Sequence, residues 1–221
     1  MSEEETAGDL APEEGWVAEE LASEFPRLGL VTLSVEAVPG RSPRAVRQRL
    51  KDLSSRFRGA TAVTMRQDPV PWAYRVFYRH IGLDPDHTRT PVEEAAVQRL
   101  IRGEFRSENR VDDALLISLV ETGVPIWALD ASKVDGPIGV RTASANERLG
   151  REAEAPAIQA GRLVVADAGS PLGVLFGDIA PGHGVMPATR RMTLFAVRVP
   201  NVPEIHVDEA LWTCADLLRV A

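Results

Sequence analysis

The side chains that most often bind metals or act as nucleophiles are few in this sequence. They are four histidines and one cysteine: His80, His87, His183, His206 and Cys214. The histidines lack the paired spacing on one helix face that zinc hydrolases use, and a single cysteine excludes both a multi-cysteine metal site and an internal disulfide. Cys214 lies in an apolar helical pattern, which favours a small core residue over a nucleophile. We therefore expect neither a metal ion nor a cofactor.

Motifs for phosphate binding and for serine nucleophiles are also missing. Gly173, Gly177, Gly182 and Gly184 lie in a strand and loop context, whereas a phosphate-binding loop joins a strand to a helix and carries a lysine. The sequence contains no Gly-x-Ser-x-Gly run, the motif that presents a serine nucleophile at a strand-to-helix turn. Short motifs alone therefore leave the function undetermined.

The net charge of −7 conceals a basic middle segment. Residues 1–26 hold nine acidic residues and neither Lys nor Arg, residues 41–110 carry a net charge of +7, and residues 111–221 carry −5. An acidic protein is a poor candidate for nucleic-acid binding, but the basic segment removes that objection. Almost all its cations are arginines, which bind phosphate in a bidentate manner and stack on bases. A high-GC codon preference would produce the same arginine bias, and we favour that explanation.

The elements that must position any site follow from hydrophobic periodicity. Helices are predicted at about 12–25, 42–58, 72–81, 91–102, 112–122 and from residue 208 to the end, and strands at 30–38, 61–66, 126–129, 137–142, 162–167, 171–177 and 192–199. The length of 221 residues and the hydrophobic content of 44% fit one globular unit. We therefore expect a single mixed α/β domain, residues 15–221, after a disordered acidic leader, residues 1–14.

Local signals define some of these boundaries well. Thr90 and Glu93 have the spacing of a capping box with Pro91 at the first helical position, and Gly103 follows the last periodic residue. Ser42 before Pro43 predicts the N-cap of the preceding helix. No apolar run approaches the length of a membrane span, and the acidic N-terminus lacks the positive start of a signal peptide, so we expect a cytoplasmic protein.

A longer pattern comprises Asn109 to Asp113, Ser118, Gly123 to Asp130, Gly136 to Ala143 and Glu147. It resembles the central stretch of the B3/B4 domain, the editing module of the bacterial phenylalanyl-tRNA synthetase beta subunit, which also occurs as stand-alone proteins. The resemblance continues through Leu163 to Asp167, Leu172 to Asp178, and Thr189 with Arg190. Upstream, Arg75, Gly82 to Pro85 and Arg89 to Glu93 are similar to the stand-alone members. Together these segments cover roughly residues 15 to 220.

The resemblance implies a mixed sheet flanked by helices, with a pocket between them. In the synthetase that pocket receives the 3′ end of a mischarged tRNA and hydrolyses the aminoacyl ester. A positioned water, backbone donors and the terminal ribose hydroxyl suffice for this reaction, so no nucleophile motif is needed. The expected partner is therefore the aminoacyl end of a tRNA.

The polar pocket positions of the family are apolar in this chain. The family's pocket histidine falls on Trp127, its Thr-Asn pair on Leu115 and Leu116, and its strand glutamate on Phe195. Loss of these groups argues against a site that sorts tyrosine from phenylalanine.

The backbone framework of the family is retained. It comprises Asn109, Gly177 and Thr189, which are the candidate catalytic positions, and Arg190 with Arg191 as candidate phosphate contacts if the pocket mouth lies beside them.

Two hypotheses follow from this pattern. In the first, the domain hydrolyses misacylated tRNA in trans, with its pocket reshaped by Trp127 and Phe195 for a smaller or more apolar amino acid. In the second, these two aromatic residues fill the cavity, and the chain is a non-catalytic module that binds RNA or a protein. The sequence names neither the amino acid nor the tRNA, and it leaves the oligomeric state open.

Overall fold

The computed structural model describes residues 11–57, 59–152 and 154–220. They form seven α-helices: α1 (Glu19–Glu24), α2 (Arg44–Arg56), α3 (Gly59–Thr64), α4 (Pro69–His80), α5 (Pro91–Arg102), α6 (Arg110–Thr122) and α7 (Glu204–Arg219). The strands are β1 (Glu13–Glu14), β2 (Trp16–Val17), β3 (Gly29–Glu36), β4 (Ile126–Asp130), β5 (Gly139–Thr142), β6 (Leu163–Ala166), β7 (Pro171–Val174) and β8 (Arg191–Arg198). The mixed α/β class is confirmed.

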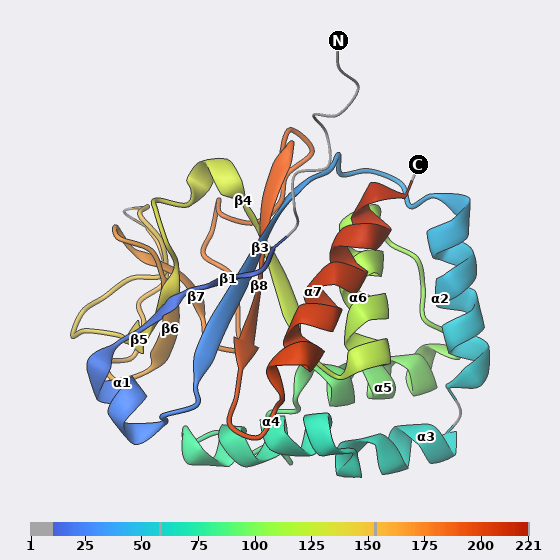
Figure 1. The fold of residues 1–221 in the computed structure, drawn as a ribbon, viewed down its shortest axis with the longest axis horizontal. Helices are drawn as coiled ribbons and strands as arrows, with labels where there is room; N and C mark the ends of the chain where they lie inside the picture. The colour runs from blue at the N-terminus through green and yellow to red at the C-terminus, as the bar shows by residue number, and fades with distance from the viewer. Residues whose placement is uncertain (1–10, 58, 153, 221) are drawn as a thin grey trace.

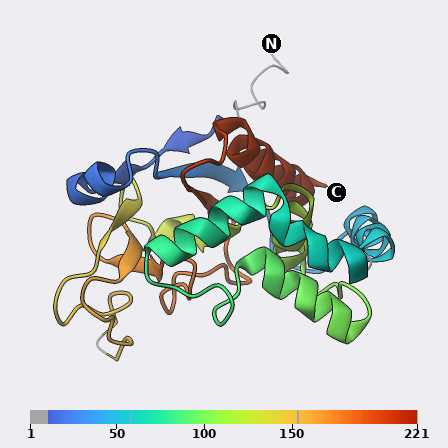
Figure 2. The ribbon, with the colours of Figure 1, turned by 90° about the horizontal axis from the view of Figure 1, so that it is seen from below.

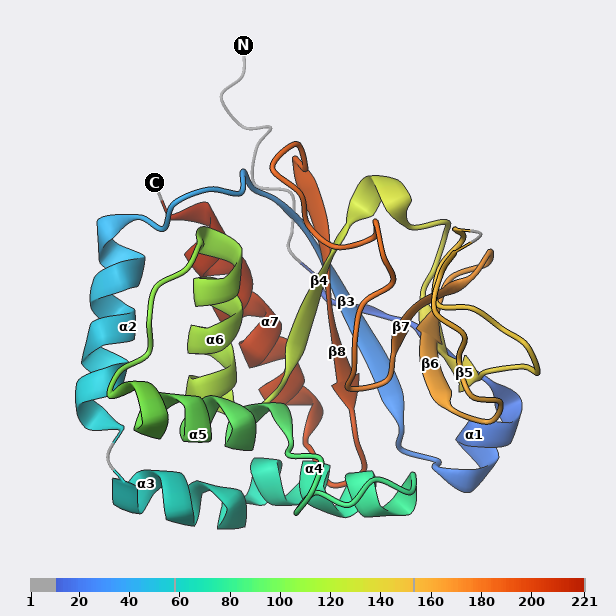
Figure 3. The same ribbon diagram turned by 180° about the vertical axis from the view of Figure 1, so that it is seen from behind.

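The strands divide into two sheets. A central antiparallel sheet has the order β1-β3-β8-β4, and an outer mixed sheet has the order β2-β5-β6-β7. Helices α6 and α7 flank the central sheet on one side, and the outer sheet with α1 lies on the other (Figure 1). Helices α3 and α4 run along the bottom, as the view from below also shows (Figure 2). The view from behind places α5 across the lower end of α6 (Figure 3).

Strand β3 shows why the central sheet forms where the alternation predicts it. Val31, Leu33 and Val35 are at most 2% exposed, whereas Ser34 and Glu36 on the opposite face are exposed. Successive side chains of a strand point to opposite faces, so one face of β3 joins the core. The predicted half-buried strand is confirmed.

The predicted helix at about 12–25 is wrong in its first half. Trp16 and Val17 instead form β2, which pairs in parallel with Gly139 and Val140 of β5. The backbone N–H of Gly15 donates to Leu30 O at 2.7 Å, which ties this segment to the central sheet as well. These pairings with distant residues override the local helical spacing, and only Glu19–Glu24 is helical.

The predicted strand at 61–66 is also wrong. Residues Gly59–Thr64 form α3, and Met65–Gln67 form a 3-10 turn with Met65 buried. The segment lies at the bottom of the helical layer, away from both sheets (Figure 1). A strand there would leave its backbone N–H and C=O groups without partners, whereas a helix satisfies them internally.

The helix ends with strong local signals are confirmed. Thr90 and Glu93 form the reciprocal capping box of α5, and Gly103 takes the left-handed conformation with φ of 80°. Helices α4 and α7 begin earlier than predicted, at Pro69 and Glu204. Of the predicted leader, residues 1–10 lie outside the described residues, and Glu13–Glu14 form β1 against β3.

Candidate functional site

Trp127 and Phe195 lie side by side on one face of the central sheet. They are direct partners in the β4–β8 register, and their rings stack with centroids 5.5 Å apart and planes at 14°. The alternation of β4 turns Trp127 to the opposite face from Ala128. Phe195 is 2% exposed and Trp127 is partly buried.

Phe176 covers this pair from the outer sheet. Its ring centroid is 6.0 Å from that of Trp127 and 4.9 Å from that of Tyr78, on which it stacks. Phe176 has a φ of 59°, a left-handed conformation that is rare for a bulky residue. We refer to Trp127, Phe195, Phe176 and Tyr78 as the aromatic stack. Its rings occupy the space between the two sheets.

Gly177 follows Phe176 in the turn after β7. Its backbone N–H donates to Val174 O at 2.8 Å, which closes the turn. Gly177 is therefore adjacent in the chain to Phe176, whose ring contacts Trp127. Its N–H already has a partner within the chain.

Asn109 caps helix α6. Its Oδ1 accepts from the backbone N–H groups of Val111 and Asp112, each at 3.0 Å, and its Nδ2 donates to the Asp112 carboxylate. An asparagine at the N-cap satisfies N–H groups that have no partner within the helix. The hydrogen bonds of this side chain are therefore made with the first turn of α6, which they stabilise.

Asn109 and Leu115 line one wall of a cavity of about 390 Å³, which we name the α6 cavity. Ala128 of β4 and the segment Val185 to Pro187 line the other walls, together with Pro39 and Gly40. A pocket for a small ligand typically has about 300–1,000 Å³. Neither Trp127 nor Phe195 lines this cavity, because their side chains point to the other face of the sheet.

Leu115 and Leu116 are separated by the helix that carries them. Leu116 lines a different cavity of about 270 Å³ between α5 and α6, with Gln98 and Phe105. Consecutive residues of an α-helix point about 100° apart, so the two leucines face different spaces. The structure therefore does not bring together the two positions that the resemblance assigns to one pocket.

Thr189 links β4 by hydrogen bonds to the loop that forms one wall of the α6 cavity. Its hydroxyl donates to Asp130 Oδ2 at 2.5 Å and accepts from the backbone N–H of Met186 at 3.0 Å. Burial alone would raise the pKa of Asp130, but the hydrogen bonds from Thr189 and Ser132 outweigh it and lower that pKa below its usual value. Thr189 is 2% exposed, so this bond holds the loop from inside.

Arg190 lies beside the α6 cavity, and Arg191 follows it as the first residue of β8. Arg190 Nη1 donates to Pro187 O at 3.2 Å and to Thr189 O at 3.0 Å, so its guanidinium lies against a residue of the cavity wall. Ala37 N donates to Arg190 O at 3.1 Å, shortly before Pro39 and Gly40 of the opposite wall. Both arginines are exposed. Arg190 therefore contacts the wall of this cavity, and the predicted phosphate contact of the two arginines stays a prediction.

Sequence reasoning missed a buried carboxylate that holds the start of α6. Asp113 is 1% exposed and accepts hydrogen bonds from Ser42 Oγ at 2.5 Å, Ser107 Oγ at 2.6 Å and Glu108 N at 2.9 Å. The predicted N-cap Ser42 therefore bonds to α6, and Pro43 is the N-cap of α2. No local signal links residues 71 positions apart, so only the fold could identify this pair.

The upstream segment of the resemblance forms an ion-pair network. Arg75 is 5% exposed, donates to Asp86 Oδ1 at 2.5 Å and pairs with Glu93, the capping-box residue of α5. Arg141 donates to Glu147 in a second ion pair, at 2.9 Å. Both networks support the fold.

Cys214 is fully buried, as the helical pattern predicts, and burial raises the pKa of its thiol to about 12. Within the described part of the chain, no group of three or more His, Cys, Asp and Glu side chains is placed to hold a metal ion. None of the helices described is long and apolar enough to cross a membrane.

Comparison with known proteins places the chain in a family. The family model of the B3/4 domain matches residues 73–194, more than half of the chain, from within α4 to within β8. The match includes Asn109, Trp127, Gly177 and Thr189 and ends one residue before Phe195. No curated protein matches the sequence. The resemblance to the B3/B4 domain is thereby confirmed, and the chain belongs to the B3/4 domain family.

Proposed function

We propose that this protein binds the 3′ end of a tRNA, with the terminal nucleotide in the α6 cavity and Arg190 and Arg191 on the adjoining phosphates. The observation that carries the proposal is the position of Arg190, whose exposed side chain lies against Pro187 of the cavity wall. Arg191 follows it in the chain and is also exposed. Guanidinium groups bind phosphate through bidentate hydrogen bonds, and the cavity volume of about 390 Å³ lies in the range of small-ligand pockets.

The hydrogen bonds at the candidate catalytic positions favour binding over hydrolysis. Asn109 bonds to the first turn of α6, Thr189 bonds to Asp130 and Met186, and Gly177 N–H bonds to Val174. A group that positions water needs a free donor or acceptor. The aromatic stack also occupies the space that Trp127 and Phe195 would border. The non-catalytic hypothesis therefore has more support than ester hydrolysis in trans.

Binding is tested with purified protein and a tRNA labelled at its 5′ end, by fluorescence anisotropy over a range of salt concentrations. We expect affinity to fall steeply with salt. The double variant Arg190→Gln/Arg191→Gln should weaken binding and flatten the plot of log affinity against log salt, by about 0.7–0.9 for each lost phosphate contact. A tRNA that lacks its last three nucleotides should bind more weakly than the intact tRNA.

The matched control is Arg44→Gln/Lys51→Gln, which removes two exposed cations from α2 at the far edge of the helical layer (Figure 1). Equal losses in both double variants, or a loss in the control alone, would overturn the assignment to the α6 cavity. Deacylation is measured in parallel with a panel of aminoacyl-tRNAs that includes small and non-protein amino acids. Faster deacylation of any of them would establish the hydrolase hypothesis in place of simple binding.

A further inference from the structure

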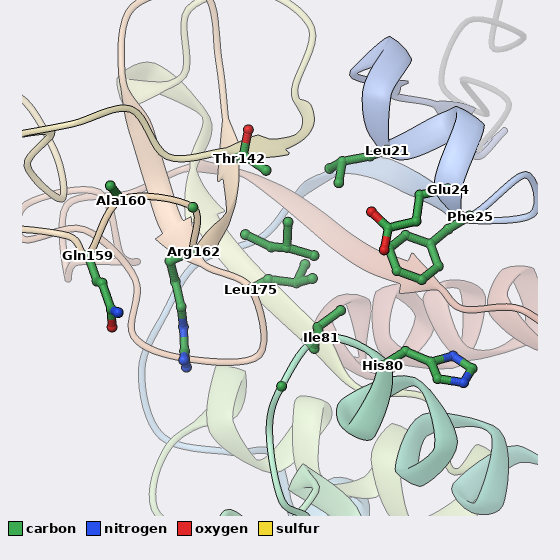
Figure 4. A pocket seen from close by; sticks show the side chains of 13 residues that line it. Leu21, Glu24, Phe25, His80, Ile81, Thr142, Gln159, Ala160, Arg162 and Leu175 are labelled. Carbon is green, nitrogen blue, oxygen red and sulfur yellow. The ribbon is translucent and has the colours of Figure 1, made fainter.

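A second cavity lies on the other side of the central sheet from the α6 cavity. Its volume is about 450 Å³, and it lies between α1, the end of α4 and the turn before β6; we name it the α1 cavity (Figure 4). None of its lining residues lines the α6 cavity, and none is a candidate residue of the family site. Any ligand here is therefore separate from the proposed tRNA end.

The floor and one side of the α1 cavity are apolar. Leu21, Leu163 and Leu175 are each at most 9% exposed and form the floor. The ring of Phe25 stacks on His80 at 6.4 Å and meets Phe77 edge to face at 5.2 Å. Its orientation is therefore set by neighbours on α4, and the cavity offers a shaped apolar surface.

Two opposite charges lie on facing sides of this surface. Glu24 comes from α1 on the side of Phe25 and His80, and Arg162 lies on the other side next to Gln159, with Leu175 between them (Figure 4). Both residues are exposed, and within the part of the chain that the structure describes neither the Glu24 carboxylate nor the Arg162 guanidinium forms a hydrogen bond or an ion pair. The nearby Arg141, in contrast, is bonded to Glu147 at 2.9 Å.

The turn that presents Arg162 is fixed by its own backbone. Gly161 has a φ of 80° and donates to Ala143 O at 2.9 Å, and Arg162 N donates to Gln159 O at 3.1 Å. Ala143 N in turn donates to Arg162 O at 2.7 Å. The backbone of the turn that carries Arg162 is thus fixed next to Leu163 of the floor.

We propose that the α1 cavity binds a small zwitterion that carries its cation and its carboxylate at the two ends of an apolar chain. The cation pairs with Glu24, the carboxylate forms a bidentate pair with Arg162, and the chain lies on Leu175 and Phe25. Two unpaired, opposite charges across an apolar floor are complementary to such a ligand. A ligand with one charge would leave the other side chain without a partner.

The test uses the full chain and isothermal titration with 6-aminohexanoate, in which five methylene groups separate an ammonium from a carboxylate. L-lysine serves as a second probe, and hexylamine and hexanoate serve as singly charged controls. We expect 6-aminohexanoate to bind about twofold to fivefold more tightly than either control, since an ion pair with an exposed side chain contributes at most about 1 kcal/mol. Equal affinity for hexylamine or hexanoate, or no binding of either zwitterion, would overturn the proposal.

Charge variants assign any binding to this cavity. Glu24→Gln and Arg162→Gln should each weaken 6-aminohexanoate binding about twofold to fivefold, whereas Glu19→Gln, which removes an exposed carboxylate of the same helix outside the cavity, should have no effect. The swapped variant Glu24→Arg/Arg162→Glu should restore affinity, because the ligand can bind in the reverse direction. Unchanged affinity in both single variants would contradict the assignment, and tRNA affinity measured in the same variants tests the α6 cavity separately.

Discussion

The aromatic stack offers the sharpest test of whether the family pocket is filled. Truncation of a buried phenylalanine to alanine costs about 3–5 kcal/mol, because it loses apolar burial and leaves a cavity. Phe195 is 2% exposed and stacks on Trp127, so we expect Phe195→Ala to lower the free energy of unfolding by about this amount. The total free energy of unfolding of a globular domain is about 5–15 kcal/mol, so Phe195→Leu serves as a milder variant should the alanine variant fail to fold.

A double-mutant cycle isolates the contact itself. Stacked aromatic pairs contribute about 0.5–1.5 kcal/mol beyond the area that they bury, so Trp127→Leu and Phe195→Leu should be coupled by this amount. The assay is urea unfolding followed by circular dichroism, because one variant removes a tryptophan. Trp72→Ala is the control, since Trp72 is 48% exposed and should change stability by at most about 0.5 kcal/mol.

The outcome decides between the two hypotheses for the pocket. A cost below about 1 kcal/mol for Phe195→Ala, with no coupling to Trp127, would mean that the rings border solvent rather than each other. The aromatic rings would then not fill the pocket, and the deacylation assay would decide whether the protein hydrolyses aminoacyl-tRNA.

Three further predictions test other parts of the structure. Asp113→Ala should lower the free energy of unfolding by about 3 kcal/mol or more in urea, because it leaves three hydrogen-bond donors without their acceptor. Thr189→Val should raise the pKa of Asp130, because it removes a hydrogen bond to the carboxylate. The lowered pKa of Asp130 in the parent stabilises the fold at neutral pH, and this stabilisation is lost as the pH falls through that pKa. The stability difference between parent and Thr189→Val, measured by urea unfolding, should therefore be largest near neutral pH and shrink on acidification. Cys214 should react with a thiol reagent only after unfolding, since its side chain is fully buried and its pKa is raised to about 12.

The candidate site was only partly predictable from the sequence. Asn109, Leu115 and Arg190 lie at one cavity, as a shared pocket requires, but Leu116, Trp127 and Phe195 face other spaces. The resemblance aligns positions along the chain, whereas membership of a pocket depends on the face to which each side chain points. The contact of Phe176 with Trp127 was not predictable, because nothing in the local sequence indicates that the ring of Phe176 reaches Trp127.

The sequence by itself determined the elements whose signals act within a few residues. The capping box of Thr90 and Glu93, the left-handed Gly103 and the strand β3 all appear in the structure as predicted. Such signals work through caps, turns and side-chain direction, and each needs only neighbouring residues.

Tertiary structure alone decided what the remaining segments became and what fills the space between the sheets. The pairing of Trp16 with Gly139 made a strand from a helical pattern, and the lack of a neighbouring strand made a helix from residues predicted as β. Trp127 and Phe195 come from two strands, β4 and β8, and Phe176 from the turn after β7. The free energy of these contacts comes from partners that are far apart in the chain, and local propensities of a few tenths of a kcal/mol per residue, on the order of host–guest values, cannot oppose it.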